Sequence, residues 1–392
     1  MRRTVVTGVG MVPFTTPRLS APYTTMAAEA VAAALDDAAL TLDHVQQAYA
    51  GYVYGDSTSG QRALYELGPT GMPIINVNNN CSTGSSALWL ARQAVTSGAA
   101  ECVLAFGFEQ MRPGALDAMW EDRPSPFDGF TQVARQAQGS SEAPFAAQLF
   151  GGAGAAYAER HGTRPETFAK ISVKARQHAA NNPYAVFRDP VSVDEVLASP
   201  SIHGPLTRLQ CCPPTCGAAA AIVTSQDFAR RHGLRTDVAI TAQSLTTDTP
   251  DSFTGSMERL VGFNMAQTAA DAVYDQAGID PRDVDVVELH DCFTSNELLS
   301  YEALRLTPEG TAERFIHDGD NTYGGRVVTN PSGGLLSKGH PLGATGLAQC
   351  AELTWQLRGE ADGRQVEGAR VGLQHNIGLG GAAVVTLYEK AS

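Results

Sequence analysis

The sequence has little positive charge, and this shortage excludes whole classes of partner. Twenty-eight lysines and arginines stand against forty-one aspartates and glutamates, a formal net charge of −13. An acidic surface repels nucleic acid and anionic membranes, so neither is expected as a general partner. An anionic ligand would need a local cluster of basic side chains.

Long apolar runs and a disulfide pattern are also missing. No stretch of eighteen uncharged apolar residues occurs in the 392 residues, so no membrane span is predicted. The seven cysteines are odd in number and irregularly spaced, which is poor material for a disulfide framework and indicates a reducing compartment. We therefore expect a cytoplasmic protein. With 43% hydrophobic residues, the chain has enough apolar surface for two domains or one large duplicated domain.

A dinucleotide-binding motif and a zinc-binding motif are each incomplete in this sequence. Gly8-Val9-Gly10 follows an apolar segment, but Pro13 occupies the place of the third glycine of a dinucleotide fingerprint. The group Cys211, Cys212 and Cys216 lacks the second ligand pair of a zinc site. The sequence thus predicts no metal and no permanently bound cofactor.

What is present is an alternation of apolar segments with strand and helix character. Strands are expected at residues 3–7, 45–55, 102–108, 217–224, 238–244 and 284–289, and helices at 26–40, 150–161, 168–180, 264–277, 297–304 and 347–357. This order predicts an α/β fold with a parallel sheet covered on both faces. Residues 111–204 break the rhythm with Pro, Gly, Ser and Gln, and we interpret them as an inserted loop domain.

One cysteine stands where a thiol is easily activated. Small residues and an apolar stripe follow Cys81, so a helix should begin at or just after it and end near Gly98. The N–H groups and positive dipole of a helix start favour thiolate over thiol. The alternative is a small buried hydrophobic residue, the commoner role of a free cysteine.

Three further segments carry polar groups at strand ends. The segment HDCF at residues 290–293 follows the strand 284–289, at the edge of a parallel sheet where sites usually lie. Residues 330–346 form a glycine-rich loop with His340, and residues 374–378 are expected in a loop between two strands of 371–389. Each signal alone is modest, because a lone histidine is more often structural than catalytic.

Together these segments resemble the four catalytic loops of the thiolase superfamily. The runs are NNNCSTG at 78–84, HDCF at 290–293, GHPLGATG at 339–346 and QHN at 374–376. More narrowly, they resemble the sterol carrier protein X type of thiolase and its bacterial relatives, over essentially the whole chain. The resemblance implies a duplicated thiolase fold in five layers, α/β/α/β/α. The N-terminal half would be residues 1–228, including the loop domain at about 111–204, and the C-terminal half would be residues 229–392. The resemblance also implies that the protein is a homodimer or a dimer of dimers.

The sequence departs from most thiolases at four positions. Their second loop begins Asn-Glu and their last carries a cysteine, whereas this chain has His290-Asp291 and Asn376 there. The resemblance to the sterol carrier group assigns the second active cysteine to Cys292 instead. The family also commonly has Asp where Cys216 stands, and the consequence of that change is open.

The resemblance implies a role for each group. Cys81 would be the nucleophile and His340 the base that deprotonates it. His290 and His340 would bind the thioester oxygen, and Cys292 would deliver a proton. The backbone N–H groups of Cys81 and Gly378 would form a second oxyanion hole, and Asp291 and Asn376 would support the loops.

These roles predict an acyl-CoA C-acyltransferase that cleaves a 3-oxoacyl-CoA with coenzyme A through an acyl-cysteine, as in fatty-acid or sterol side-chain β-oxidation. Coenzyme A would be a co-substrate. One alternative is a steroid side-chain aldolase acting with an OB-fold partner, although the relatives of that kind lack the nucleophilic cysteine. Another is a non-catalytic acyl-binding subunit. Acyl chain length, branching and reaction direction stay open, because residues 111–204 would supply the pocket walls.

Overall fold

The computed structural model describes residues 2–114 and 120–391, so residues 115–119 of the expected loop domain lie outside the described residues. Ten strands form one sheet in the order β10-β9-β11-β12-β8-β1-β7-β4-β2-β3. Their bounds are β1 Thr4–Met11, β2 Gln47–Gly51, β3 Ile74–Val77, β4 Cys102–Glu109, β7 Gly217–Ser225, β8 Val238–Thr246, β9 Val286–Glu288, β10 Val328–Thr329, β11 Val371–Gly378 and β12 Ala382–Lys390. A separate pair consists of β5 Ser201–His203 and β6 Leu206–Thr207.

Helices cover both faces of this sheet. Those of the first half are α1 Tyr23–Asp37, α2 Ser59–Leu64, α3 Thr83–Ser97 and α8 Gln226–Arg231. The segment between β4 and β7 holds α4 Asp128–Gln138, α5 Phe145–His161, α6 Pro165–Ala179 and α7 Val193–Ala198. The second half holds α9 Met257–Leu260, α10 Phe263–Ala277, α11 Thr294–Ala303, α12 Ala312–His317, α13 Gly334–Ser337 and α14 Leu342–Arg358.

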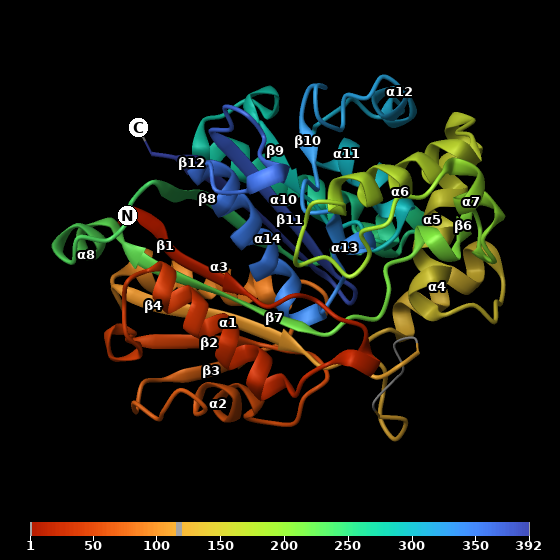
Figure 1. Ribbon diagram of the computed structural model, residues 1–392. Coiled ribbons are helices and arrows are strands. Elements are labelled where there is room, and N and C mark those ends of the chain that lie inside the picture. The colour runs from red at the N-terminus through yellow and green to blue at the C-terminus, as the bar shows by residue number, and fades with distance from the viewer. Residues whose placement is uncertain (1, 115–119, 392) are drawn as a thin grey trace.

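The two halves meet along a narrow join and then enclose two helices. Strands β1 and β8 pair only through Thr4 with Ile240 and Val5 with Ala239. Beyond this join the sheet halves separate, and α3 and α14 fill the space between them (Figure 1). Helix α1 lies on the outer face of the first half and α10 on that of the second. This gives the five layers α/β/α/β/α that the resemblance implies.

The sheet is mixed rather than parallel, which corrects the expectation from the strand and helix order. Strands β2, β3 and β4 run parallel, but β7 is antiparallel to both β1 and β4. The segment between β4 and β7 brings the chain back to the end of the sheet where β4 leaves it, since Glu109 at the end of β4 pairs with Gly217 at the start of β7. The expectation of helices on both faces is confirmed.

The central helix α14 is apolar on nearly every side, as a helix between two sheets must be. Its residues from Leu342 to Leu357 are buried apart from Trp355. Glycines permit its close approach to the first half: a Cβ on Gly84, Gly107 or Gly343 would lie less than 3.0 Å from backbone oxygen atoms. The helix begins at Leu342, five residues before the predicted start, so it follows His340 almost directly.

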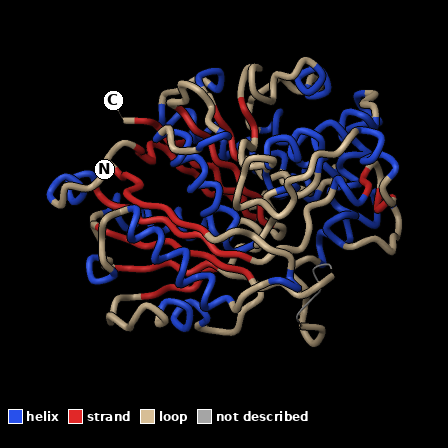
Figure 2. Tube along the Cα trace, viewed as in Figure 1, coloured by secondary structure: helices blue, strands red, loops and turns tan. Residues whose placement is uncertain are grey.

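The inserted segment is more helical than its composition suggests. Its Pro, Gly, Ser and Gln pattern predicted loops with two helical stretches, whereas the described residues of this segment form the four α-helices α4 to α7. Figure 2 shows helix as the main element of this region. Packing against the second half stabilises two of these helices: α5 packs on α9 and α11, and α6 packs on α11 and α13. Among the described residues, none of the helices has the length and apolar character needed to cross a membrane.

Candidate active site

A tightly held turn presents Cys81 at the start of α3. Asn80 has a left-handed backbone (φ 52°), and the helix begins two residues after the cysteine, as predicted. The Thr83 hydroxyl donates to the Asn80 carbonyl (2.6 Å) and accepts from the Asn79 N–H (2.8 Å), which locks the turn. A Cβ on Gly378 would lie less than 3.0 Å from the Asn79 carbonyl oxygen, so the end of β11 packs directly against this turn.

Two histidines converge on the Cys81 sulfur. His290 follows β9, and His340 lies between α13 and α14. The Sγ of Cys81 and one ring nitrogen of each histidine all lie within 4.8 Å of one another, and all three residues are buried. Segments about 200 and 250 residues distant from Cys81 in sequence thus meet at one point.

The surroundings of His340 leave it a free lone pair. The Thr345 hydroxyl donates to the Pro341 carbonyl (3.0 Å), so its oxygen accepts from Nδ1–H of His340 (2.7 Å). In a neutral ring the other nitrogen, Nε2, then carries no proton. Nε2 is buried and has no hydrogen-bond partner among the described residues. The ring is therefore oriented as a proton acceptor.

The cysteine and histidine rest in their neutral forms. Burial raises the pKa of the Cys81 thiol to about 12, with a smaller contribution from Glu109. Burial also lowers the pKa of His340 to about 3. The expectation that the helix start makes Cys81 a thiolate is therefore wrong for the protein without ligand, because desolvation outweighs the dipole. Activation requires proton transfer from Sγ to the imidazole.

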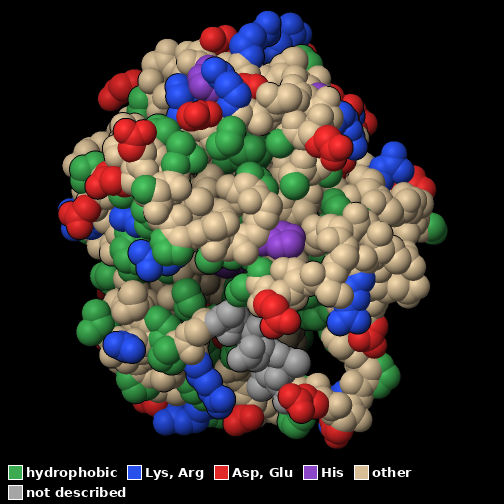
Figure 3. All heavy atoms as spheres, turned by 90° about the vertical axis from the view of Figure 1, so that its right-hand side faces the viewer, with side chains coloured by type: hydrophobic (Ala, Val, Ile, Leu, Met, Phe, Trp, Pro, Cys, Tyr) green, Lys and Arg blue, Asp and Glu red, His purple; other side chains and the backbone are tan. Residues whose placement is uncertain are grey.

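An apolar cavity of about 470 Å³ opens above these groups. Its lining comes from the Cys81 turn, both histidines, the inserted segment and the end of β11, and includes Phe145, Phe150, Ile202, Pro213, Pro214, Phe293, Ile377 and Leu379. On the face formed by the inserted helices, acidic and basic side chains are interspersed (Figure 3). The apolar walls of the cavity favour an apolar ligand group.

Comparison with known proteins gives consistent matches along the chain. Residues 4–227 match the family described as "Thiolase, N-terminal domain", and residues 248–389 match "Thiolase C-terminal domain-like". The chain is 56% identical to "Sterol carrier protein 2" of Rattus norvegicus over 391 residues, which covers 98% of this chain and 72% of that protein. It is 33% identical to "Acetyl-CoA acetyltransferase" of Methanothermobacter thermautotrophicus, with 100% of both chains covered.

The chain belongs to the thiolase superfamily. Within it, the similarity to sterol carrier protein 2 identifies a thiolase of that type. Solved structures agree on the fold. The "Ltp2-ChsH2(DUF35) aldolase" matches with a TM-score of 0.84 at 24% identity, covering 99% of this chain and 98% of that chain. Human mitochondrial 3-ketoacyl-CoA thiolase matches with a TM-score of 0.75 at 18% identity, covering 100% of this chain and 99% of that chain.

The thiolase site holds a second cysteine, Cys292, and two more, Cys211 and Cys212, that the sequence did not place there. Cys292 is 4% exposed and lines the cavity with Cys81. The N–H of Cys212 donates to the Cys292 carbonyl (2.9 Å), and Cys212 lines the same cavity. Burial, reinforced by the neighbouring thiols, raises the pKa of Cys292 well above its usual range. Cys292 is therefore protonated at neutral pH.

Asp291 connects the two histidine loops. Its carboxylate accepts from the N–H groups of Leu335 (2.7 Å) and Leu336 (3.3 Å), in the first turn of α13. A Cβ on Gly334 would collide with this carboxylate, so glycine is required there. Burial and the nearby Glu297 raise the pKa of Asp291 to about 8. The aspartate thus links the segment leading to His340 with the segment carrying His290, and its supporting role in the site stays a prediction.

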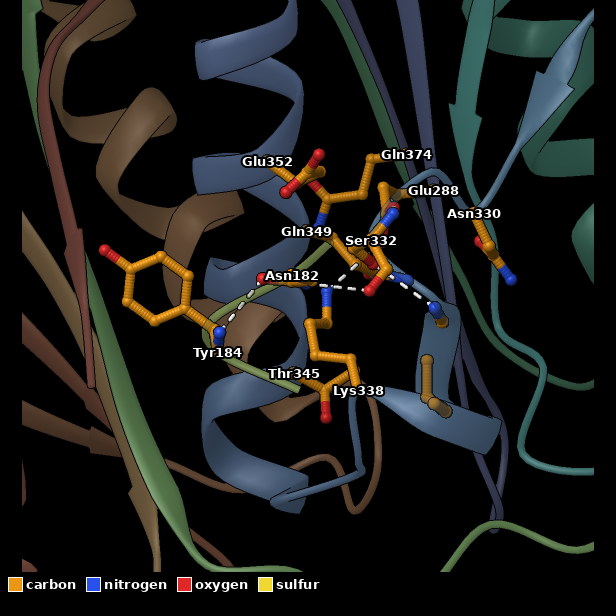
Figure 4. Close-up of polar contacts among 12 residues, drawn as sticks. Asn182, Tyr184, Glu288, Asn330, Ser332, Lys338, Thr345, Gln349, Glu352 and Gln374 are labelled. Atoms are coloured by element: carbon orange, nitrogen blue, oxygen red, sulfur yellow. Dashed lines mark hydrogen bonds and ion pairs between the residues drawn. The ribbon is translucent and has the colours of Figure 1, made fainter. Parts of the chain in front are cut away.

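A buried ion pair joins Lys338 and Glu288 (Figure 4). Lys338 Nζ is 3.2 Å from Glu288 Oε2, and the two residues are 1% and 0% exposed. The same carboxylate accepts from the backbone N–H and hydroxyl of Ser332. Each member of the pair precedes a site histidine by two residues. Sequence analysis missed this pair, and the spacing Lys338-Gly339-His340 was the available signal.

The backbone N–H groups near the Cys81 sulfur differ slightly from the expected pair, Cys81 and Gly378. The N–H groups of Cys81 itself and of Leu379 act on the Cys81 sulfur and partly offset the rise in its pKa. The sequence predicted Gly378, one residue earlier, as the second donor of an oxyanion hole, and that role stays a prediction. Residues 374–378 are not a loop: they belong to β11, with Asn376 paired to Val384 of β12.

The Glu109 carboxylate links the first half of the chain to helix α14. Its carboxylate accepts from the N–H groups of Val53, Tyr54 and Gly343 at 2.9 to 3.1 Å. Burial raises the pKa of this group to about 7. It therefore joins the ends of β2 and β4 to the first turn of α14, close behind His340.

Proposed function

We propose that the protein is an acyl-CoA C-acyltransferase that cleaves a 3-oxoacyl-CoA with coenzyme A through an acyl-Cys81 intermediate. The observation that carries this proposal is the convergence of Sγ of Cys81 with ring nitrogens of His290 and His340 within 4.8 Å, beneath an apolar cavity. Nucleophile, base and hydrogen-bond donor are then all present where a thioester substrate would react.

In the first half-reaction, His340 Nε2 takes the proton of Cys81 as the sulfur attacks the 3-oxo carbon. The bond between C2 and C3 breaks, and its electron pair forms the enolate of acetyl-CoA, or of propionyl-CoA from a 2-methyl substrate. The enolate oxygen accepts hydrogen bonds from His290 and from the newly protonated His340. Cys292 then gives its proton to C2. A thiol whose pKa is raised is suited to this step, because it holds the proton until a strong carbon base needs it.

In the second half-reaction, the Cys292 thiolate takes the proton of the incoming coenzyme A. The coenzyme A sulfur attacks the acyl-Cys81 carbonyl, and the backbone N–H groups near Cys81 bind the tetrahedral oxygen. The shortened acyl-CoA leaves, and Cys81 recovers its proton from His340. Coenzyme A is thus a co-substrate, and its binding in a human mitochondrial 3-ketoacyl-CoA thiolase structure is consistent with that use. We propose a homodimer or dimer of dimers as the assembly, and cytoplasmic β-oxidation as the setting.

Intact-protein mass spectrometry after incubation with acetoacetyl-CoA tests the proposal. We expect an acetyl adduct on the wild-type protein, no adduct on Cys81→Ser, and an unchanged adduct on Cys102→Ala, a buried thiol in β4 away from the cavity. Thiolysis assays with straight, 2-methyl and steroid-derived 3-oxoacyl-CoA esters would then define the acyl group. No adduct and no thiolysis with any ester would overturn the proposal.

A separate assay with a 3-hydroxyacyl-CoA and no coenzyme A tests the aldolase alternative. An aldolase would cleave a 3-hydroxyacyl-CoA without coenzyme A, and this cleavage would survive Cys81→Ala. The intact Cys81 and its base favour acyl transfer. The match to an aldolase structure is a likeness of fold at 24% identity, so it does not favour that chemistry.

A further inference from the structure

A chain of buried hydrogen bonds ends on the ring of His290. It starts at the Gly346 carbonyl in α14 and passes through Gln374 in β11, Ser85 in α3 and Asn376 in β11. We propose that this chain holds His290 in the tautomer with its proton on Nε2, which makes His290 an obligate hydrogen-bond donor to the reacting oxygen. The catalytic half of this inference rests on the proposed function, whereas the proton assignment does not.

The direction of the chain is set at its first member. The Gly346 carbonyl can only accept, and Gln374 Nε2 lies 2.7 Å from it, so this end of the amide is the NH₂ group. The opposite end, Oε1, accepts from the Tyr388 hydroxyl, in agreement with that orientation. The second hydrogen of Gln374 Nε2 is therefore directed to Ser85 Oγ, at 2.8 Å.

Ser85 passes this direction to Asn376. Its oxygen is occupied by the donor from Gln374, and its own hydrogen points to Asn376 Oδ1 at 3.2 Å. Asn376 then presents Nδ2 to Nδ1 of His290, at 2.8 Å. A flipped Asn376 would direct a second N–H at Ser85 and leave the serine hydrogen without an acceptor in this chain. An unpaired buried hydroxyl costs about 1–3 kcal/mol, which disfavours the flip.

An amide N–H only donates, so Nδ1 of His290 must carry the lone pair. Desolvation lowers the pKa of His290 well below its usual value, with His340 and His375 adding to the effect, so the ring is neutral. In a neutral ring with a free Nδ1, the proton resides on Nε2. Because Nδ1 is occupied by Asn376, Nε2 is the nitrogen left to face Cys81.

The two site histidines consequently have opposite polarity. His290 donates through Nε2, whereas His340 accepts through Nε2 because Thr345 holds its Nδ1–H. The chain that orients His290 also crosses the molecule, since Ser85 belongs to the first half and Asn376 to the second. Ser85, Gln374 and Asn376 are all 0% exposed, so water cannot replace a link. These three are positioning residues for His290.

The matching experiment reads the proton directly. Full-length protein labelled with ¹⁵N-histidine would be studied by NMR, with the His290 signals assigned from a His290→Gln sample. We expect the proton on Nε2 in the wild type at pH 7 and no movement in Tyr388→Phe, because the Gly346 carbonyl still orients Gln374. A wild-type proton on Nδ1 would overturn the assignment without any variant being needed.

Asn376→Asp tests the consequence for turnover. The isosteric carboxylate accepts instead of donating, so the His290 proton should move to Nδ1, and kcat for thiolysis should fall about 100-fold or more, with KM changed less than threefold. Alkylation of Cys81 by iodoacetamide should be retained. A moved proton with unchanged kcat would overturn the catalytic role of the chain. Absence of thiolysis in the wild type would instead defeat the proposed function, while the NMR result would still decide the tautomer.

Discussion

The imidazole rings of His290 and His340 lie edge to face, with centroids 5.1 Å apart and planes at 83°. They reach this arrangement from different segments, one after β9 and one before α14. One nitrogen of each ring lies within 4.8 Å of the Cys81 sulfur, and by our assignment His290 presents a donor there and His340 an acceptor. The site therefore does not need a charged histidine before substrate arrives.

The neutral resting state predicts an unusual alkylation profile for Cys81. Because burial raises the pKa of this thiol to about 12, the reactive thiolate fraction should increase about tenfold per pH unit from pH 7 to 9. The rate of iodoacetamide labelling at Cys81, followed by peptide mass spectrometry, should show no plateau in this range. A plateau below pH 8 would indicate a thiolate and imidazolium pair instead.

The buried histidines predict instability in acid. Burial lowers the pKa of His178, His340 and His375 to about 3, so their unfolded forms bind protons below pH 6.5 while the folded forms do not. Each histidine should therefore contribute a fall in stability of about 1.4 kcal/mol per pH unit as pH decreases from 6.5 toward 3. The raised pKa values of Asp291 and Glu109 act with the opposite sign and offset part of this fall. Urea unfolding at pH 7.5, 6 and 5 measures this.

A His375→Gln variant provides the matched comparison. Both ring nitrogens of His375 are buried without a partner among the described residues. Its removal should make the decrease in stability with pH shallower by one histidine. An unchanged slope would show that His375 is not neutral in the folded protein.

Breaking the ion pair of Lys338 and Glu288 should be costly. Lys338→Met leaves the Glu288 carboxylate buried without its cation, which predicts a loss of about 3–5 kcal/mol of unfolding free energy and a lower kcat. The double variant Lys338→Met with Glu288→Gln should recover part of the stability, because no charge is then unpaired. The exposed pair Arg62 and Glu66 is the control, and Arg62→Ala should cost less than about 1 kcal/mol. Equal losses of unfolding free energy in Lys338→Met and Arg62→Ala would contradict the prediction.

Close packing at the Cys81 turn predicts that Gly378 tolerates no side chain. In Gly378→Ala the new Cβ meets the Asn79 carbonyl, so the turn must move and acyl-Cys81 formation should slow by about 100-fold. Gly129→Ala in α4 adds the same methyl where the nearest atom outside its own helix is 3.6 Å away, in Phe253. That variant should keep wild-type acylation and stability. Rapid-quench mass spectrometry compares the two rates.

Several features of the site follow from local sequence, and others do not. The small residues after Cys81 indicate a helix start, and α3 begins two residues later. The chain at 374–378 looks like a loop because glycines flank it, but pairing with β12 makes it a strand. The sequence considers Cys212 only as part of an incomplete zinc motif, whereas the structure places it in the cavity wall, with its N–H donating to the Cys292 carbonyl. The boundary between the halves at residues 228 and 229 stays a prediction.

The sequence by itself determined the family, the two-half architecture and the four segments that carry Cys81, His290, His340 and Asn376. Helix starts and strand ends are local features, and residue order is enough to reveal them. Only the tertiary structure decided the protonation of the site. Desolvation outweighed the helix dipole at Cys81, and a hydrogen-bond chain from both halves set the polarity of His290. Solvent exclusion and side-chain direction arise from contacts between distant segments, and no local pattern contains them.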